Sequence, residues 1–148
     1  MSDTHAAMIQ RYYNDLFCVG KMDTTAVDRY MADEFIAHDL PLAQGGCEDY
    51  KRFISMLTAS FSEMNRINVC ELLSCGDRVV VRWSWSGKHT AEFMGIPATH
   101  RQITLKGIDI LRLAEGKIAD LWQEIDIMGI LQQISAPPRN TQPLHGAD

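Results

Sequence analysis

Hydrophobic residues change their spacing along the chain, from a helical period in the first part to alternation in the second. Before residue 66, apolar side chains recur every three to four residues, which is typical of amphipathic helices. The helices predicted on this ground are residues 3–19, 22–31 and 47–61. Residues 32–42 are predicted to be a loop or a short extended segment.

After residue 66, apolar and polar residues alternate, as they do in strands with one buried face. The predicted strands are residues 67–74, residues 78–86 and the two arms of a hairpin within residues 102–126. In the second strand Val79, Val81, Trp83 and Trp85 share a face. A final helix is predicted over residues 127–134, with Asp126 as its cap.

Helices followed by consecutive strands indicate an α+β fold rather than alternating βαβ units. We expect a curved antiparallel sheet whose N-terminal helices lie on its inner face and enclose a pocket. Residues 1–134 are predicted to form one domain. Residues 135–148 hold three of the five prolines and little apolar material, so we expect a flexible tail there.

Composition excludes several classes of protein. The net charge of −5 over 148 residues argues against a nucleic-acid surface. No apolar stretch approaches the roughly 18 residues that cross a membrane, and the N-terminus lacks the apolar segment of a signal peptide. The four cysteines lack metal or redox spacing, so we expect reduced, mostly buried thiols in a cytoplasmic protein. The histidines lie in separate segments, and no metal site is predicted.

The predicted hairpin places two polar residues on its buried face. Because strand residues alternate sides, Arg112, Asp120 and Glu124 mark an outer face that also includes Ile118 and Trp122. Asp109 and Gln123 then point inward. A turn centred near Glu115 sets Gly107 opposite Gln123, so Asp109 and Gln123 are predicted to be diagonal neighbours within reach of one ligand.

The same stretch carries a resemblance to a known family. The run GDRVVVRWSWSGKHTAEFMGIPATHRQITLKGIDILRLAEGKIADLWQEIDIMGILQQI resembles the SnoaL-like polyketide cyclase (ester cyclase) family, which has the nuclear-transport-factor-like cone fold. The matching elements include Gly76–Val79, Gly95–Pro97, Gly107–Asp109 and Gly116–Ile118. The resemblance covers roughly residues 5–134.

The resemblance implies a cofactor-free enzyme that acts on a polyketide-like β-keto ester. The family's cyclases use an inward-facing aspartate as general acid and base, one residue after the position matching Trp122. That position here is Gln123, and an amide cannot exchange a proton near neutral pH. A histidine of the cyclases aligns with Asp109, which implies that the carboxylate has moved across the hairpin.

We therefore expect Asp109 to have a raised pKa and to act as base or acid, or else to be a structural carboxyl bonded to a backbone amide or to Arg112. Gln123 is a candidate donor to the substrate carbonyl or enolate oxygen, and a structural amide is the alternative. His38 is a candidate to relay a proton or orient Asp109, against a loop histidine bonded to Asp39 or a carbonyl. Further candidates for contact with a hydrophobic substrate are Tyr12, Trp83, Phe93, Met94, Ile96 and Leu121; most are equally compatible with plain core.

Three functions remain open from the sequence. The first is a lyase, isomerase or cyclase of a hydrophobic carbonyl compound in a biosynthetic pathway. The second is a binding or accessory protein that lost the acid/base residue, and the third is an epoxide hydrolase-like enzyme in which Asp109 activates water. The family resemblance also implies a homodimer formed through the outer face of the sheet.

Overall fold

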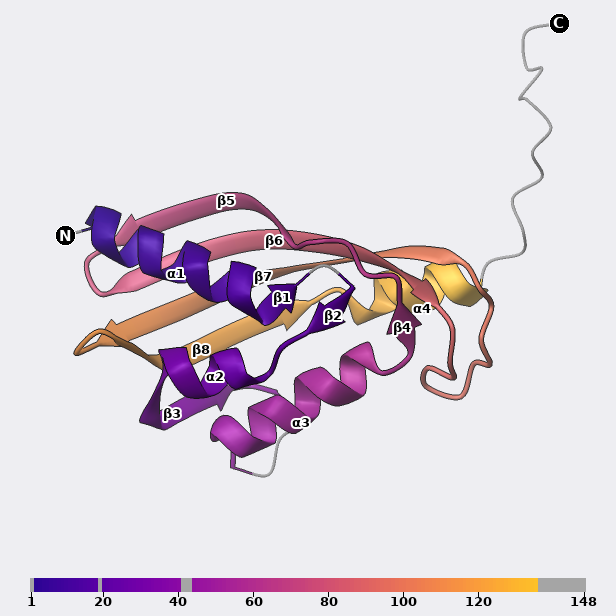
Figure 1. Cartoon of the computed structure of the whole chain (residues 1–148), viewed down its shortest axis with the longest axis horizontal. Coiled ribbons are helices and arrows are strands. Elements are labelled where there is room, and N and C mark those ends of the chain that lie inside the picture. Colours follow the sequence, from indigo (N-terminus) through magenta and orange to yellow (C-terminus); the bar gives the residue numbers. More distant parts are fainter. Residues whose placement is uncertain (1, 19, 41–43, 136–148) are drawn as a thin grey trace, which may run out of the picture.

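The computed structural model describes residues 2–18, 20–40 and 44–135, which form an α+β fold (Figure 1). The helices are α1 (Ser2–Leu16), α2 (Thr25–Tyr30), α3 (Cys47–Thr58) and α4 (Ile127–Ser135). The long strands are β3 (Met31–His38), β5 (Asn68–Cys75), β6 (Arg78–His89), β7 (Gln102–Ala114) and β8 (Lys117–Ile125). The short strands are β1 (Phe17–Cys18), β2 (Lys21–Met22) and β4 (Phe61–Ser62).

The main sheet is curved and open. Its order is β3-β8-β7-β6, and β4 and β5 both pair with β6. Neighbouring strands are antiparallel except at one edge, where β3 runs parallel to β8. The predicted fold class is confirmed, with this parallel edge strand added to it.

Several predicted boundaries are wrong because tertiary pairing overrides local pattern. The first helix ends at Leu16, since Phe17–Cys18 pairs with Lys21–Met22. The third helix ends at Thr58 instead of residue 61. Residues 32–42, predicted to be loop or short extended chain, contribute most of the eight-residue strand β3, because β8 supplies its hydrogen-bond partners. Residues 136–148 of the predicted tail lie outside the described residues.

The hairpin of β7 and β8 turns where predicted, but its register is different. Glu115 and Gly116 have φ of 52° and 77°, so they form a tight two-residue turn. The register then shifts between Arg112 and Leu113, a β-bulge that places one extra residue on β8. Consequently Asp109 lies directly opposite Gln123, not diagonal to it.

The bulge also corrects one face assignment. Ile118 and Ala119 are both buried, with 0% and 3% of their surfaces exposed, because the extra residue interrupts the alternation there. Ile118 therefore faces the core, whereas the sequence pattern placed it outside. Beyond the bulge the predicted alternation holds, and Leu121 and Gln123 are buried.

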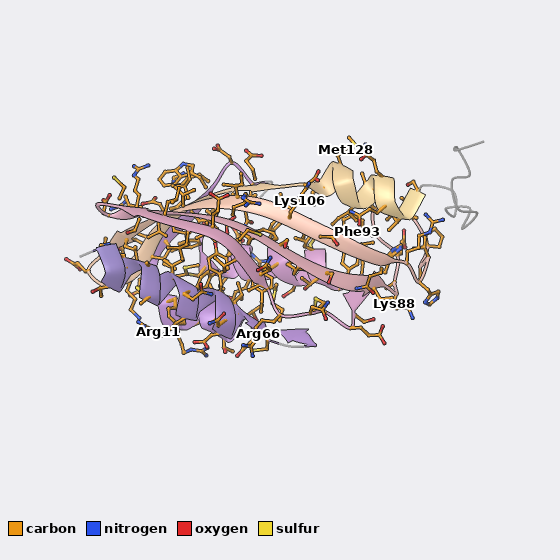
Figure 2. The ribbon with its side chains drawn as sticks, turned by 90° about the horizontal axis from the view of Figure 1, so that it is seen from above. Arg11, Arg66, Lys88, Phe93, Lys106 and Met128 are labelled. Atoms are coloured by element: carbon orange, nitrogen blue, oxygen red, sulfur yellow. The ribbon has the colours of Figure 1, made fainter. Side chains whose placement is uncertain are left out.

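The core fills the space between the inner face of the sheet and the N-terminal helices (Figure 2). The predicted face of β6 is confirmed, since Val79, Val81, Trp83 and Trp85 are all buried.

The Asp126 carboxylate accepts a hydrogen bond from the Gly129 amide at 2.9 Å, so Asp126 caps α4 as predicted. No helix among the described residues is long and apolar enough to cross a membrane.

The four cysteines are free thiols. The prediction that most of them are buried is wrong. Cys18, Cys47 and Cys70 are half-buried and Cys75 is exposed. Cys70 and Cys75 lie on β5, which among the described residues pairs with β6 alone. In residues 2–18, 20–40 and 44–135, no three His, Cys, Asp or Glu side chains are grouped as metal ligands.

Candidate active site

Asp109 lies on the inner face of the sheet, near the middle of its width. On β7 it is paired with Val81 of β6 and Gln123 of β8. Only 2% of its surface is exposed, and Leu111 and Leu121 beside it are fully buried. A carboxyl group in such surroundings is strongly disfavoured in its charged form.

One hydrogen bond orients the carboxyl. The hydroxyl of Tyr13, on the buried side of α1, donates to Asp109 Oδ2. Burial raises the pKa of Asp109 to about 6, and the hydroxyl of Tyr13 and the nearby N–H groups of Trp83 and Gln123 oppose this rise. The other carboxyl oxygen, Oδ1, is buried without a hydrogen-bond partner. At neutral pH the group is therefore largely a carboxylate, and one of its two oxygens accepts no hydrogen bond.

Two further tyrosines extend this polar group. Gln123 Nε2 donates to the hydroxyl of Tyr50, on α3, at 3.3 Å. Tyr12 lies next to Tyr13 in the sequence, and its ring meets the Tyr13 ring edge-on at 5.1 Å between centroids. Burial raises the pKa of Tyr12, and Tyr50 and Asp109 add to the effect. These hydroxyls therefore keep their protons and act as neutral donors. We call the set Tyr12, Tyr13, Tyr50, Trp83, Asp109 and Gln123 the aspartate cluster.

The structure places His38 elsewhere. It lies on β3, paired with Trp122, and its ring stacks on the Trp122 ring at 4.7 Å on the outer face of the sheet. Its Nε2 bonds Asp120 at 2.8 Å. The expectation that His38 orients Asp109 is corrected, because the strand pairing directs its side chain to the opposite face.

The predicted substrate-contacting residues divide into two groups. Tyr12, Trp83 and Leu121 are buried on the same side of the sheet as Asp109. Phe93 and Met94 instead line a pocket of about 650 Å³ beside the C-terminal end of α3, with Leu57 and Ile127. Ile96 holds this loop through backbone hydrogen bonds to Phe93. Since Tyr50 precedes Leu57 by two helical turns, the pocket lies roughly 10 Å along α3 from the cluster.

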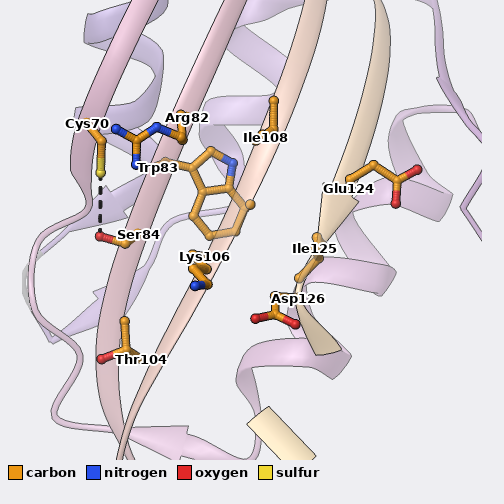
Figure 3. A pocket seen from close by; sticks show the side chains of 11 residues that line it. Cys70, Arg82, Trp83, Ser84, Thr104, Lys106, Ile108, Glu124, Ile125 and Asp126 are labelled. Atoms are coloured by element: carbon orange, nitrogen blue, oxygen red, sulfur yellow. Dashed lines mark hydrogen bonds between the residues drawn. The ribbon is translucent and has the colours of Figure 1, made fainter. Parts of the chain in front are cut away.

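A second hollow of about 620 Å³ lies on the outer face of the sheet (Figure 3). Its lining is of mixed charge and includes Arg82, Lys106, Ile108 and Glu124. Ile108 is 48% exposed, unusual for an isoleucine in the middle of a sheet. The expectation that two copies pair through this face stays a prediction.

Comparison with known proteins decides the family. The model of the SnoaL-like polyketide cyclase family matches residues 7–134. The chain belongs to this family. Among characterised relatives, nogalonic acid methyl ester cyclase of Streptomyces nogalater is 26% identical over 124 residues, 82% of this chain and 90% of that protein. Aklanonic acid methyl ester cyclase DauD of Streptomyces sp. strain C5 is 25% identical over 126 residues, 83% of this chain and 77% of the other.

Solved structures share the fold of this chain. A SnoaL-like protein from Jannaschia sp. CCS1 superposes with a TM-score of 0.78 at 21% identity, covering 93% of this chain and 95% of that one. TsrD from Streptomyces laurentii gives a TM-score of 0.75 at 24% identity, covering 88% of this chain and 97% of TsrD. At these identities the likeness establishes the architecture of this SnoaL-like protein.

Sequence reasoning did not assign two members of the aspartate cluster. Either Tyr12 or Tyr13 could present a hydroxyl inward by the sequence pattern, and Tyr12 was the predicted site residue, whereas the structure bonds Tyr13 to Asp109. Tyr50 lies in the apolar stripe of its helix, and only the structure shows its hydroxyl bonded to Gln123. A phenol within an apolar stripe that faces a strand carboxylate was the available signal, since a buried hydroxyl usually finds a partner.

Proposed function

We propose that this SnoaL-like protein is a cofactor-free enzyme that uses acid and base chemistry to close a ring in a hydrophobic, polyketide-like β-keto ester. One observation carries the proposal: Asp109 is buried, its pKa is raised to about 6, and its Oδ1 is free to take a proton. The named relatives are methyl ester cyclases, which agrees with this substrate class.

The proposed reaction uses the same carboxyl twice. Asp109 Oδ1 takes the proton from the carbon between the ketone and the ester, and the C–H electron pair becomes the enolate. The enolate carbon then attacks a second carbonyl of the same molecule, forming a C–C bond and leaving an alkoxide. The alkoxide takes the proton back from Asp109, so the product carries a hydroxyl and the enzyme is restored.

In this proposal Gln123 assists Asp109 and does not itself act as acid or base. It stands directly opposite Asp109 across the hairpin, so a carboxyl on either strand reaches nearly the same place. Its amide donates to Tyr50 and helps to hold the pKa of Asp109 below the value that burial alone gives. Gln123 is thus a positioning residue in this proposal.

Hydrogen–deuterium exchange at the acidic carbon tests the first step without knowledge of the natural substrate. An aromatic β-keto methyl ester is followed by proton NMR in D₂O between pH 5 and 8. The protein should accelerate the exchange, with a rate that rises through about pH 6 as Asp109 ionises. Asp109→Asn should lose roughly 10²–10⁴-fold in the catalysed rate.

Asp15→Asn is the matched control. Asp15 also accepts a hydrogen bond from a tyrosine hydroxyl, that of Tyr30 at 2.6 Å, but its side chain is 45% exposed and lies outside the cluster. This variant should exchange like the unaltered protein. Exchange that survives Asp109→Asn overturns the assignment. Tight binding of the ester with no exchange at any pH overturns the enzyme and identifies a binding protein.

A further inference from the structure

The aspartate cluster contains three buried polar atoms that make no hydrogen bond of normal distance and angle to a protein group. They are the Tyr12 hydroxyl, Trp83 Nε1 and Asp109 Oδ1, and among the described residues only two other buried side-chain atoms share this condition. Buried polar atoms without partners are rare, because each loses its hydrogen bonds to water on folding. Two donors and one acceptor left open in one place indicate a ligand with the complementary groups.

The position of the Trp83 indole depends on Gly107. A Cβ atom at Gly107 would lie 2.5 Å from Trp83 Cζ2, 2.9 Å from its Cε2 and 2.7 Å from the Glu124 carbonyl oxygen. The indole therefore lies directly over β7, as Figure 3 shows, with the ring edge that carries Nε1 against the strand. Because Gly107 is two residues before Asp109 on the same face, the N–H lies near the carboxyl, where it opposes the rise of the Asp109 pKa without making a hydrogen bond of normal geometry.

The other donors near Asp109 are already engaged. Tyr13 donates its proton to Oδ2, and Gln123 donates to Tyr50. Tyr12 keeps its proton, since burial first and then Tyr50 and Asp109 raise its pKa. The open donors are consequently an indole N–H and a neutral phenol, which suit oxygen acceptors that gain negative charge.

We propose that Trp83 Nε1–H and the Tyr12 hydroxyl bind the two oxygens of a 1,3-dicarbonyl and stabilise its enolate, while Asp109 Oδ1 faces the carbon between them. This inference rests on the proposed function and assigns the enolate-binding donors, a role for which Gln123 was the candidate from sequence. When the proton moves to Oδ1, the charge spreads over both oxygens, where two fixed, buried donors stabilise it.

The arrangement predicts selectivity for 1,3-dicarbonyls. A mono-ketone has one acceptor, so binding it leaves either Trp83 or Tyr12 without a partner in a dry site. A simple hydrophobic pocket would discriminate poorly between two ligands of similar size. We expect at least tenfold weaker binding of the matched mono-ketone than of the dicarbonyl.

Enolate binding is measured directly with benzoylacetone, an aromatic 1,3-diketone whose enolate absorbs differently from its neutral forms. Spectral titrations across pH give the affinity of each protein variant for the enolate. Trp83→Phe and Tyr12→Phe each remove one donor and keep an aromatic ring. Each should weaken enolate binding about tenfold or more, in line with the loss of a hydrogen bond to a charged group.

Two matched variants control for packing. Trp85→Phe makes the same change two residues along the same buried face of β6. Tyr30→Phe removes a hydroxyl whose ring lies 5.6 Å from the Tyr12 ring and which bonds Asp15 instead of the cluster. Both should bind the enolate like the unaltered protein. Equal losses in Trp83→Phe and Trp85→Phe would show a packing effect and overturn the inference.

Asp109→Asn separates this inference from the proposed function. It removes a negative charge beside the enolate, so it should bind the enolate at least as tightly while losing proton exchange. If Trp83→Phe and Tyr12→Phe leave enolate affinity unchanged but Asp109→Asn abolishes exchange, the donor assignment fails and the proposed function stands. If the protein never catalyses exchange but both donor variants lose enolate binding, the proposed function fails and the binding site stands.

Discussion

Replacing Asp109 by asparagine should make the folded protein more stable at neutral pH. Folding raises the pKa of this carboxyl from 3.8 to about 6, chiefly because burial disfavours the charged form. Each tenfold change in acidity corresponds to about 1.4 kcal/mol, so the ionised carboxyl costs the folded state about 3 kcal/mol. Asparagine has nearly the same shape and can still accept the Tyr13 proton, but it carries no charge to desolvate.

The pH dependence has a definite sign. Below about pH 3.8 the carboxyl is protonated in both states and the cost is absent. Between pH 3.8 and about 6 the folded state keeps a proton that the unfolded state has released, so stability falls as pH rises. Above about pH 6 both states are ionised and the full cost is present. The stability advantage of Asp109→Asn should therefore grow from about 0.5 kcal/mol at pH 4 to about 3 kcal/mol at pH 7.5.

Urea unfolding of both proteins at several pH values measures this difference, with equal m-values as the condition for comparing midpoints. Asp120→Asn provides a control of opposite sign. Burial raises the pKa of Asp120, but hydrogen bonds from His38 and Arg112 outweigh it and the pKa is lowered. That variant should lose stability at neutral pH and lose less as pH falls. An Asp109→Asn protein that is no more stable than the parent at pH 7.5, with a difference that does not vary with pH, would refute the burial argument.

Two other substitutions test the geometry. Gly107→Ala should destabilise the fold by about 1–3 kcal/mol, because the new Cβ meets the Trp83 ring at 2.5 Å; Gly87→Ala, whose nearest contacts are at 3.2 Å, should cost less in the same urea assay. His38→Ala removes the hydrogen bond to Asp120 on the outer face of the sheet, so the catalysed exchange rate and its pH profile should not change. If the exchange rate of this variant no longer rises near pH 6 in the same NMR assay, His38 takes part in the active site.

The candidate site was only partly predictable from the sequence. Alternation along β7 and β8 was enough to place Asp109 and Gln123 on one buried face, because side-chain direction in a strand depends on parity alone. Their pairing was not predictable, since a single bulged residue moves the register, and parity does not reveal bulges. His38 was misplaced because β3 reads as a loop until β8 supplies its hydrogen bonds.

By itself the sequence determined the α+β class and the placement of Asp109 on the buried, inner face of the hairpin. These follow from local periodicity, which each segment expresses without reference to the others. Only the tertiary structure decided what that aspartate meets. Tyr13 is 96 residues away in the chain, and Tyr50 and Gln123 are 73 residues apart. Such contacts depend on how α1 and α3 pack across the curved sheet, and no pattern within a single segment encodes that distance.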